Sequence, residues 1–92
     1  MQKSLKSSEY ERLIAILVAA RHASEIRQQA LAKKLGRPQS FIAKYEGGER
    51  RIDVVEFIAI ARALEADPVK LFRDFISGEA PPAPRKRPAK KS

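Results

Sequence analysis

Residues 28–50 decide the fold, and they read QQALAKKLGRPQSFIAKYEGGER. Apolar residues recur at helical spacing on both sides of Gly36, and glycine tolerates the left-handed backbone that ends a helix. Pro38 suits the first turn of a following helix. Ala32 is a small residue of the kind that two short helices need where they cross at a steep angle. The stretch predicts a helix-turn-helix, with helices over residues 26–35 and 38–45.

The second of these helices has two different faces. Its inward stripe consists of Phe41, Ile42 and Tyr45. Its opposite face carries small or polar side chains, namely Gln39, Ser40, Ala43 and Lys44. Side chains of this kind suit the reading of base edges in the major groove of DNA.

Three further helices are predicted on either side. Ser8 with Glu11 has the spacing of a capping box and opens a helix that ends near residues 22–24. Asp53 with Glu56 opens another, with an inward stripe of Val54, Phe57, Ile58, Ala61 and Leu64. Asp67 and Pro68 open the last, with an apolar face of Leu71, Phe72, Phe75 and Ile76. No segment alternates with period two for long enough to predict a strand, so the fold class is all-α with five short helices.

Composition excludes several classes of protein. The chain has 92 residues, no Cys and one His, which leaves no disulfide framework, thiolate metal site or His cluster. Neither a nucleophile–base pair nor a metal cluster can be assembled, so we expect no catalytic residue, no metal and no cofactor. No apolar run approaches the roughly 18 residues of a membrane span, and no signal peptide opens the chain. We therefore expect a small cytoplasmic domain with no membrane partner.

Positive charge gathers in two blocks. The 19 Lys and Arg residues outnumber the 11 Asp and Glu residues, which gives a net charge of +8. Residues 26–51 hold seven basic and two acidic side chains, residues 52–79 three basic and six acidic ones, and residues 80–92 five basic ones alone. This excess indicates a polyanionic partner, first of all nucleic acid.

The same segments suggest the domain boundaries. Four of the six prolines lie in residues 80–92, where nothing larger than Ala is available for burial. Such a segment cannot offset the entropy of ordering. We expect a flexible N-terminus over residues 1–7, a folded domain over 8–78 and a disordered basic tail over 79–92.

The string from Gln28 to Arg50 resembles the helix-turn-helix of the Cro/CI repressor family, also called the xenobiotic-response-element family. The resemblance covers about residues 8–76. It implies a compact, lambda-repressor-like domain of five helices. It also implies a transcriptional regulator, a repressor, that binds a palindromic operator in double-stranded DNA as a symmetric homodimer.

The resemblance also implies roles for individual residues. Gln39, Ser40 and Lys44 would read bases, with Arg37 as a further reader; Lys44 suits guanine, and Gln39 suits adenine or a phosphate. The residues that would bind phosphates are Gln28, Arg27, Arg50 and Arg51. Arg21 and Glu46 match a partly buried ion pair between the first and third helices, and Phe75 and Ile76 would lie at the dimer interface.

Three positions depart from the family pattern. Glu25 stands where the family often has Gly, and Arg27 stands where it usually has Ser or Thr as a cap. Pro38 replaces the common capping Ser before the recognition helix, which bears on the roles of Arg37 and Gln39.

Two other functions fit parts of the sequence. An antitoxin-like module would bind a partner protein through the apolar fifth helix and the tail, and would regulate its own operon. A general RNA binder would stack bases on exposed aromatic side chains. The aromatic residues here lie on apolar stripes, which argues against the RNA binder.

Deletion of residues 80–92 tests the role of the tail. Its five positive charges are expected to add phosphate contacts without sequence information, so deletion should weaken DNA binding. The dependence of log affinity on log salt should become shallower, while the sequence preferred in a binding-site selection should stay the same. A changed preference would show that the tail contacts bases.

Overall fold

The computed structural model of the chain describes residues 7–78, which form five α-helices and no strand. The helices are α1 (Ser8–Ala23), α2 (Gln28–Leu35), α3 (Gln39–Glu46), α4 (Val54–Ala63) and α5 (Pro68–Ser77). The all-α prediction is confirmed. The predicted tail, residues 79–92, and residues 1–6 lie outside the described part of the chain.

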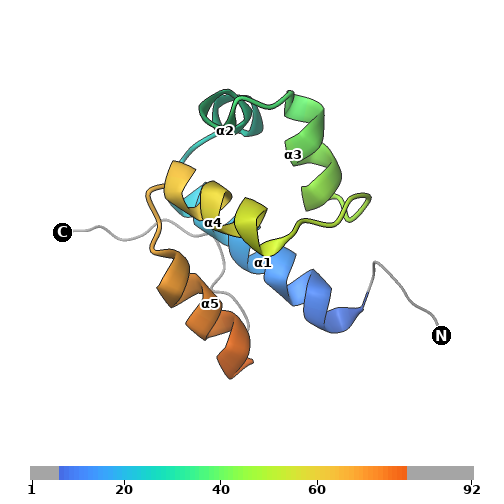
Figure 1. The fold of residues 1–92 in the computed structure, drawn as a ribbon, viewed down its shortest axis with the longest axis vertical. Helices are drawn as coiled ribbons and strands as arrows, with labels where there is room; N and C mark the ends of the chain where they lie inside the picture. Colours follow the sequence, from blue (N-terminus) through green and yellow to red (C-terminus); the bar gives the residue numbers. More distant parts are fainter. Residues whose placement is uncertain (1–6, 79–92) are drawn as a thin grey trace.

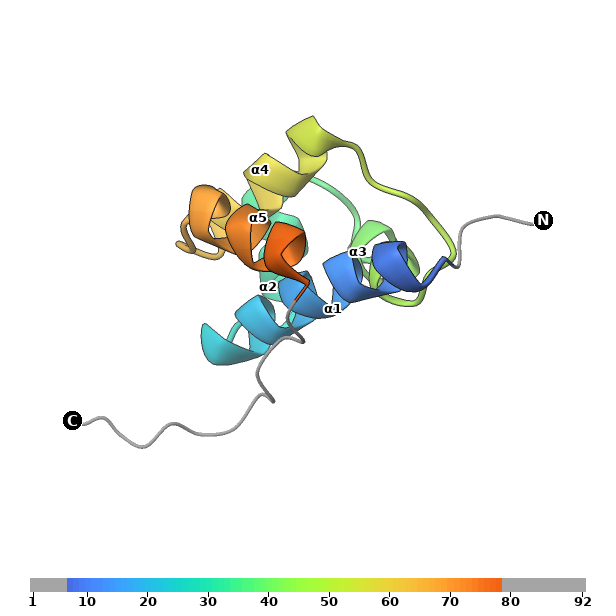
Figure 2. The same cartoon turned by 90° about the horizontal axis from the view of Figure 1, so that it is seen from below.

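The helices are arranged around the long helix α1. In Figure 1, α2 and α3 form the upper part, α4 crosses in front of α1, and α5 lies at the opposite end. Figure 2, the same fold turned by 90°, shows α5 beside α4 and α1. Helix α5 packs on α1 and α4 only, whereas α2 packs on α3 and α4. The helix-turn-helix and α5 are thus held on opposite sides of a common support.

Four helices supply the core. Its fully buried or nearly buried side chains are Tyr10, Ile14 and Leu17 of α1, Leu31 and Ala32 of α2, Phe41, Ile42 and Tyr45 of α3, Phe57 and Ile60 of α4, and Leu64 just after it. None of the described side chains of α5 is buried to the same degree. Helix α5 therefore covers the core from outside.

Side-chain caps fix where three of the helices begin. Asp53 and Glu56 form the predicted capping box at α4, and Asp67 caps α5 with Pro68 in its first turn. At α1 the predicted cap was wrong by one residue, because Ser7 rather than Ser8 accepts the bond from the Tyr10 N–H, at 3.1 Å. The capping-box spacing favours Ser8, which has Glu11 three positions later, but either serine side chain can accept the bond, and the structure uses Ser7.

The two helices of the helix-turn-helix begin later than predicted. Helix α2 begins at Gln28 rather than Ile26, because Arg27 is the extended N-cap residue. Helix α3 begins at Gln39, because Pro38 is likewise an extended N-cap with ψ of 153°. Proline lacks the N–H that would continue a helix from the preceding turn, but its fixed φ is compatible with both positions.

One residue predicted to face inward, Val54, lies at the surface, and so does part of the apolar face of α5. Val54 is 65% exposed because it occupies the first turn of α4, at the edge of the core. On the apolar face of α5, Phe72 is 44% exposed and Ile76, which was predicted to lie at the dimer interface, is 68% exposed. Leu71 and Phe75 are half-buried, and the exposed Phe72 ring still meets the buried Phe57 ring edge to face at 6.0 Å. Because α5 covers the core from one side only, its apolar stripe is wider than the surface available to bury it.

Two glutamates adopt a backbone conformation that favours glycine. Glu25, after α1, has φ of 58°, and Glu65, after α4, has φ of 59°. Both lie in turns in which backbone N–H groups bond back to the last carbonyls of the helix, for example from Ile26 to Arg21 and from Ala66 to Ala61. A left-handed turn therefore follows α1, and its residue is Glu25, at the position where the family often has Gly.

Replacement of Glu25 by glycine should stabilise the domain. The left-handed conformation costs an L-residue roughly 1 kcal/mol more than glycine, and part of this gain is offset by the greater freedom of glycine in the unfolded chain. We expect Glu25→Gly to raise the free energy of unfolding by about 0.5–1 kcal/mol, measured by urea unfolding.

Glu49→Gly is the matched control. Glu49 is also exposed in a turn, but its φ is not positive. Glycine there should lower the free energy of unfolding, because it gains freedom in the unfolded state without relieving strain. The same response at positions 25 and 49 would contradict the proposed strain at Glu25.

Candidate nucleic-acid interface

The turn between α2 and α3 sets how the two helices meet. Gly36 has φ of 68°, and the N–H groups of Gly36 and Arg37 donate to the carbonyls of Lys33 and Ala32, which ends α2. Ala32 is buried where the helices pack, as its small side chain predicts. The geometry is that of a helix-turn-helix.

Helix α3 has the two faces expected from its sequence. Phe41, Ile42 and Tyr45 are buried, and the Phe41 and Tyr45 rings meet edge to face at 5.4 Å. Burial raises the pKa of Tyr45, so its phenol stays neutral. The predicted outward face is exposed at all four of its residues, Gln39, Ser40, Ala43 and Lys44. The structure therefore brings the three predicted α3 base readers together on one accessible surface.

The ion pair expected between Arg21 and Glu46 joins α1 to the end of α3. Two guanidinium nitrogens donate to the two carboxylate oxygens at 2.7 and 3.0 Å. The side chains are only 12% and 8% exposed, respectively. Arg21 also donates to the carbonyl of Ile26, at 2.9 Å, in the segment between α1 and α2. The pair is bidentate and mostly withdrawn from water, which makes it directional as well as strong.

Gln28 connects this ion pair to the exposed face of α3. Its side-chain N–H donates to Glu46 at 2.9 Å, and its carbonyl oxygen accepts from Gln39 at 3.0 Å. Gln28, predicted to bind a phosphate, therefore has both ends of its amide engaged within the protein. The bond fixes the Gln39 side chain, which still has a carbonyl oxygen and a second N–H available.

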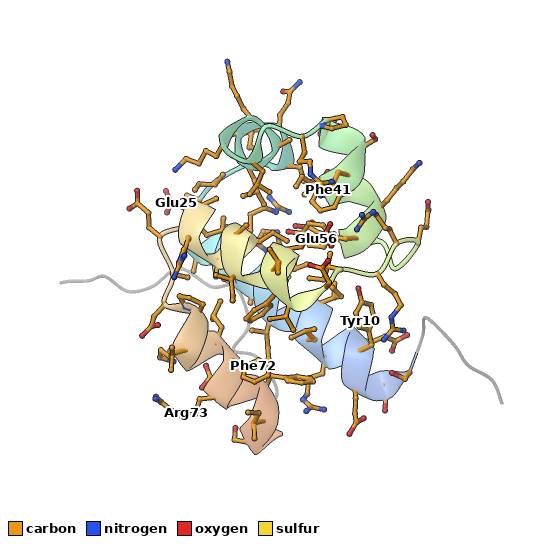
Figure 3. The ribbon with its side chains drawn as sticks, in the orientation of Figure 1. Tyr10, Glu25, Phe41, Glu56, Phe72 and Arg73 are labelled. Atoms are coloured by element: carbon orange, nitrogen blue, oxygen red, sulfur yellow. The ribbon has the colours of Figure 1, made fainter. Side chains whose placement is uncertain are left out.

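Arg37 and Arg50 flank α3 and converge on Glu56 of α4. Arg37 donates to Glu56 at 2.8 Å and Arg50 donates to it at 3.2 Å. Both guanidinium groups lie over the Phe41 ring, at 4.0 and 4.8 Å from its centre. The Phe41 and Glu56 side chains lie between α3 and α4 in Figure 3. Hydrogen bonds from Arg50 above all lower the pKa of Glu56, which keeps it ionised at neutral pH.

Tyr10 of α1 holds the loop that follows α3. Its hydroxyl accepts from the Ile52 N–H at 3.1 Å and donates to the Arg50 carbonyl at 3.4 Å. The Arg51 guanidinium lies over the Tyr10 ring at 4.3 Å. The predicted phosphate binders Arg50 and Arg51 are thus placed by α1, beside the end of the recognition helix.

The N-cap residues of α2 and α3 differ from those of the other helices. Within residues 7–78, neither N-cap residue, Arg27 or Pro38, provides a side-chain bond, and neither first turn contains an acidic residue. Arg27 is exposed, as its predicted role requires. An open groove beside these turns is lined by Gln29, Ala30, Ala32, Lys33, Arg37 and Gln39. Basic and amide groups dominate its polar lining.

The predicted dimer residues lie at the other end of the molecule. Ile76 is exposed, but Phe75 packs towards α1: its carbonyl accepts from Arg12 at 2.8 Å, and the Arg12 guanidinium lies 5.0 Å from its ring centre. Exposed Val69 and Phe72 lie on the same side of α5 as Ile76. Sequence reasoning therefore placed one of its two interface residues on the accessible surface.

Glu56 and Tyr10 are the site residues that sequence reasoning missed. The capping-box spacing identified Glu56 only as part of a helix start, and Tyr10 is an apolar position at helical spacing in the first helix. Arg37 lies 19 positions from Glu56, and Arg50 lies 40 positions from Tyr10 and six from Glu56, on the other side of a helix start. No local spacing rule connects residues so distant in the sequence. Within the described residues, no group of His, Asp or Glu could hold a metal, and no helix is long and apolar enough to cross a membrane.

The fold and the exposed polar face of α3 define a helix-turn-helix DNA-binding domain. A family model described as "Helix-turn-helix domain" matches residues 9–72. The chain belongs to this family, and within it to the XRE type, also called Cro/CI. It is a DNA-binding transcription regulator, and the predicted family and fold class are confirmed.

The assignment to the XRE type rests on the similarity to a solved structure. That structure is the "XRE-family like protein from Pseudomonas syringae pv. tomato str. DC3000", with 43% sequence identity and a TM-score of 0.74. The match covers 76% of this chain and 85% of that chain. None of the curated proteins compared matches the chain.

Removal of Glu46 should destabilise the domain severely. Glu46→Ala leaves the guanidinium of Arg21 without its carboxylate in a mostly buried position, and we expect a loss of about 3–5 kcal/mol in the free energy of unfolding. The double variant Arg21→Met/Glu46→Met replaces both charges by apolar side chains and should cost less than Glu46→Ala alone. Urea unfolding followed by circular dichroism measures both. A double variant at least as unstable as Glu46→Ala would show that the two side chains do not act as a pair.

Proposed function

We propose that this regulator is a sequence-specific repressor that binds a palindromic operator as a homodimer. The observation that carries the proposal is the exposed polar face of α3, in which Gln39, Ser40 and Lys44 lie within the most basic segment of the folded chain. A helix of this shape fits the major groove, where each base pair presents a distinct pattern of donors and acceptors. Repression requires only that the protein occupy its operator.

The proposed contacts follow from the side-chain chemistry. Lys44 donates to the two acceptors on the guanine edge, and Gln39 pairs with adenine or a phosphate, supported by its bond to Gln28. Ser40 bonds either type of base. Arg37 joins the base readers only where it leaves Glu56. The phosphate contacts come from Arg27 and Arg51. Gln28 and Arg50 join them only where they leave Glu46 and Glu56, respectively.

The homodimer is proposed through the outer face of α5. Val69, Phe72 and Ile76 recur at positions i, i+3 and i+7 and are all exposed. They form an apolar stripe, next to Phe75, on a part of the domain that does not contact α2 or α3. A two-fold axis through this stripe would leave both recognition helices free, and symmetric half-sites in DNA would match it.

The antitoxin-like alternative uses the same surface of α5 to bind a partner protein. The exposed apolar stripe supports it as well as it supports a homodimer. Sedimentation of the purified chain separates the two proposals. A homodimer that forms without any other protein would bury the apolar stripe and contradict the proposal of a partner protein there. In either case the role is that of a regulator in the cytoplasm and not of an enzyme.

Selection of binding sites from random duplex DNA should return a palindrome. We expect two half-sites about 10 base pairs apart, centre to centre. Lys44→Ala should relax the preference at one base pair of each half-site, a loss of about 1–3 kcal/mol in discrimination.

Arg27→Ala is the matched control for this selection. Its side chain is exposed at the N-cap of α2 and is proposed to contact phosphate only. The variant should weaken binding to all DNA sequences alike. The slope of log affinity against log salt should become shallower by about 0.9. If no palindrome is enriched with the wild-type chain, the sequence-specific function is wrong.

A further inference from the structure

The carboxylate of Glu56 has more partners than a helix cap requires. One oxygen, Oε1, accepts from the Asp53 N–H at 3.0 Å and so completes the capping box. It also accepts from Arg50 at 3.2 Å. The other oxygen, Oε2, accepts from Arg37 at 2.8 Å and from Arg50 at 3.2 Å. A glutamine would complete the same capping box, so the negative charge is not needed for the cap.

The charge instead holds two arginines that come from opposite ends of α3. Arg37 precedes the helix and Arg50 follows it. The Phe41 ring, which is buried on the side of α3 that faces α4, lies under both guanidinium groups. The ring contact and the ion pair therefore act together to keep both side chains against α4.

This arrangement reduces the positive charge available to DNA beside the recognition helix. Two guanidinium groups share one carboxylate that is only 17% exposed. The cluster thus presents a net charge of about +1 where two free arginines would present +2. Each phosphate that a basic group neutralises releases counterions and adds affinity for every sequence equally.

We propose that Glu56 is a positioning residue for DNA recognition, which holds Arg37 and Arg50 on α4 and thereby limits sequence-independent binding to phosphates. Discrimination then depends more on the exposed face of α3, whose readers do not contact Glu56. The proposal rests on the DNA-binding function given above and assigns Arg37 to the Glu56 cluster instead of the base readers.

Glu56→Gln tests the proposal, because it keeps the capping box and removes the charge. Binding to a random-sequence duplex is measured by fluorescence anisotropy over a range of salt concentrations. One more phosphate contact should steepen the slope of log affinity against log salt by about 0.9. Between 50 and 200 mM salt, the variant should then lose about threefold more affinity than the wild type. Its preference for the selected operator over the random duplex should fall.

Asp74→Asn is the matched control. It removes the same charge and also breaks an ion pair, with Lys70 at 3.1 Å, but on α5. Its salt slope should equal that of the wild type, because α5 does not contact α2 or α3. Equal slopes for Glu56→Gln and the wild type, or equal shifts in the two variants, would overturn the proposal.

Arg37→Gln gives a second measurement that does not depend on the stability of Glu56→Gln. While Glu56 is present, this substitution should change the salt slope by much less than 0.9, because Arg37 is already held. In the Glu56→Gln background it should remove much of the added slope. If Arg37→Gln makes the salt slope shallower by the full amount of about 0.9 while Glu56 is present, the proposal is overturned. A wild-type chain that binds no duplex DNA at all would instead contradict the DNA-binding function itself.

Discussion

The ion pair between Arg21 and Glu46 is the interaction on which the arrangement of the recognition helix depends. Arg21 lies near the end of the longest helix and Glu46 is the last residue of α3, so the bidentate contact fixes one end of α3 against α1. The same guanidinium binds the carbonyl of Ile26, which places the start of α2. Because an unpaired charge in this position would be costly, the pair favours one relative position of the three helices over others.

Aromatic rings and a second carboxylate also hold α3 and the loop that follows it. Tyr10 binds the backbone of the loop after α3, and the Phe41 ring packs against the two arginines that bind Glu56. Helix α3 is thus joined to α1 by an ion pair and to α4 by a charge cluster. The face left over is the one that carries Gln39, Ser40 and Lys44. Its accessibility is a consequence of how the opposite face is bound.

Local chemistry made most of the fold predictable. Asp53, Gly36 and the pair Asp67-Pro68 each have a strong positional preference, and each lies where that preference predicts. The errors fell where local chemistry is degenerate. Two adjacent serines can cap α1, and the structure uses the one that the capping-box spacing does not favour. The exposure of Val54 depends on where the core ends. In the site, the face of α3 followed from periodicity alone, whereas the partners of Glu56 are defined only by tertiary contacts.

These contacts show how the positive charge of residues 26–51 is distributed between the interior and the surface. This segment contains one acid at each end of the turn that follows α3, and one of them, Glu46, is only 8% exposed. Glu56 of α4 likewise turns its charge inward, to Arg37 and Arg50. Both carboxylates act within the protein, where they orient side chains and neutralise arginines that hold the fold together. Apart from the exposed Glu49, the surface around α3 therefore combines basic residues with neutral polar ones, and the negative charges of Glu46 and Glu56 that lie behind them set their position.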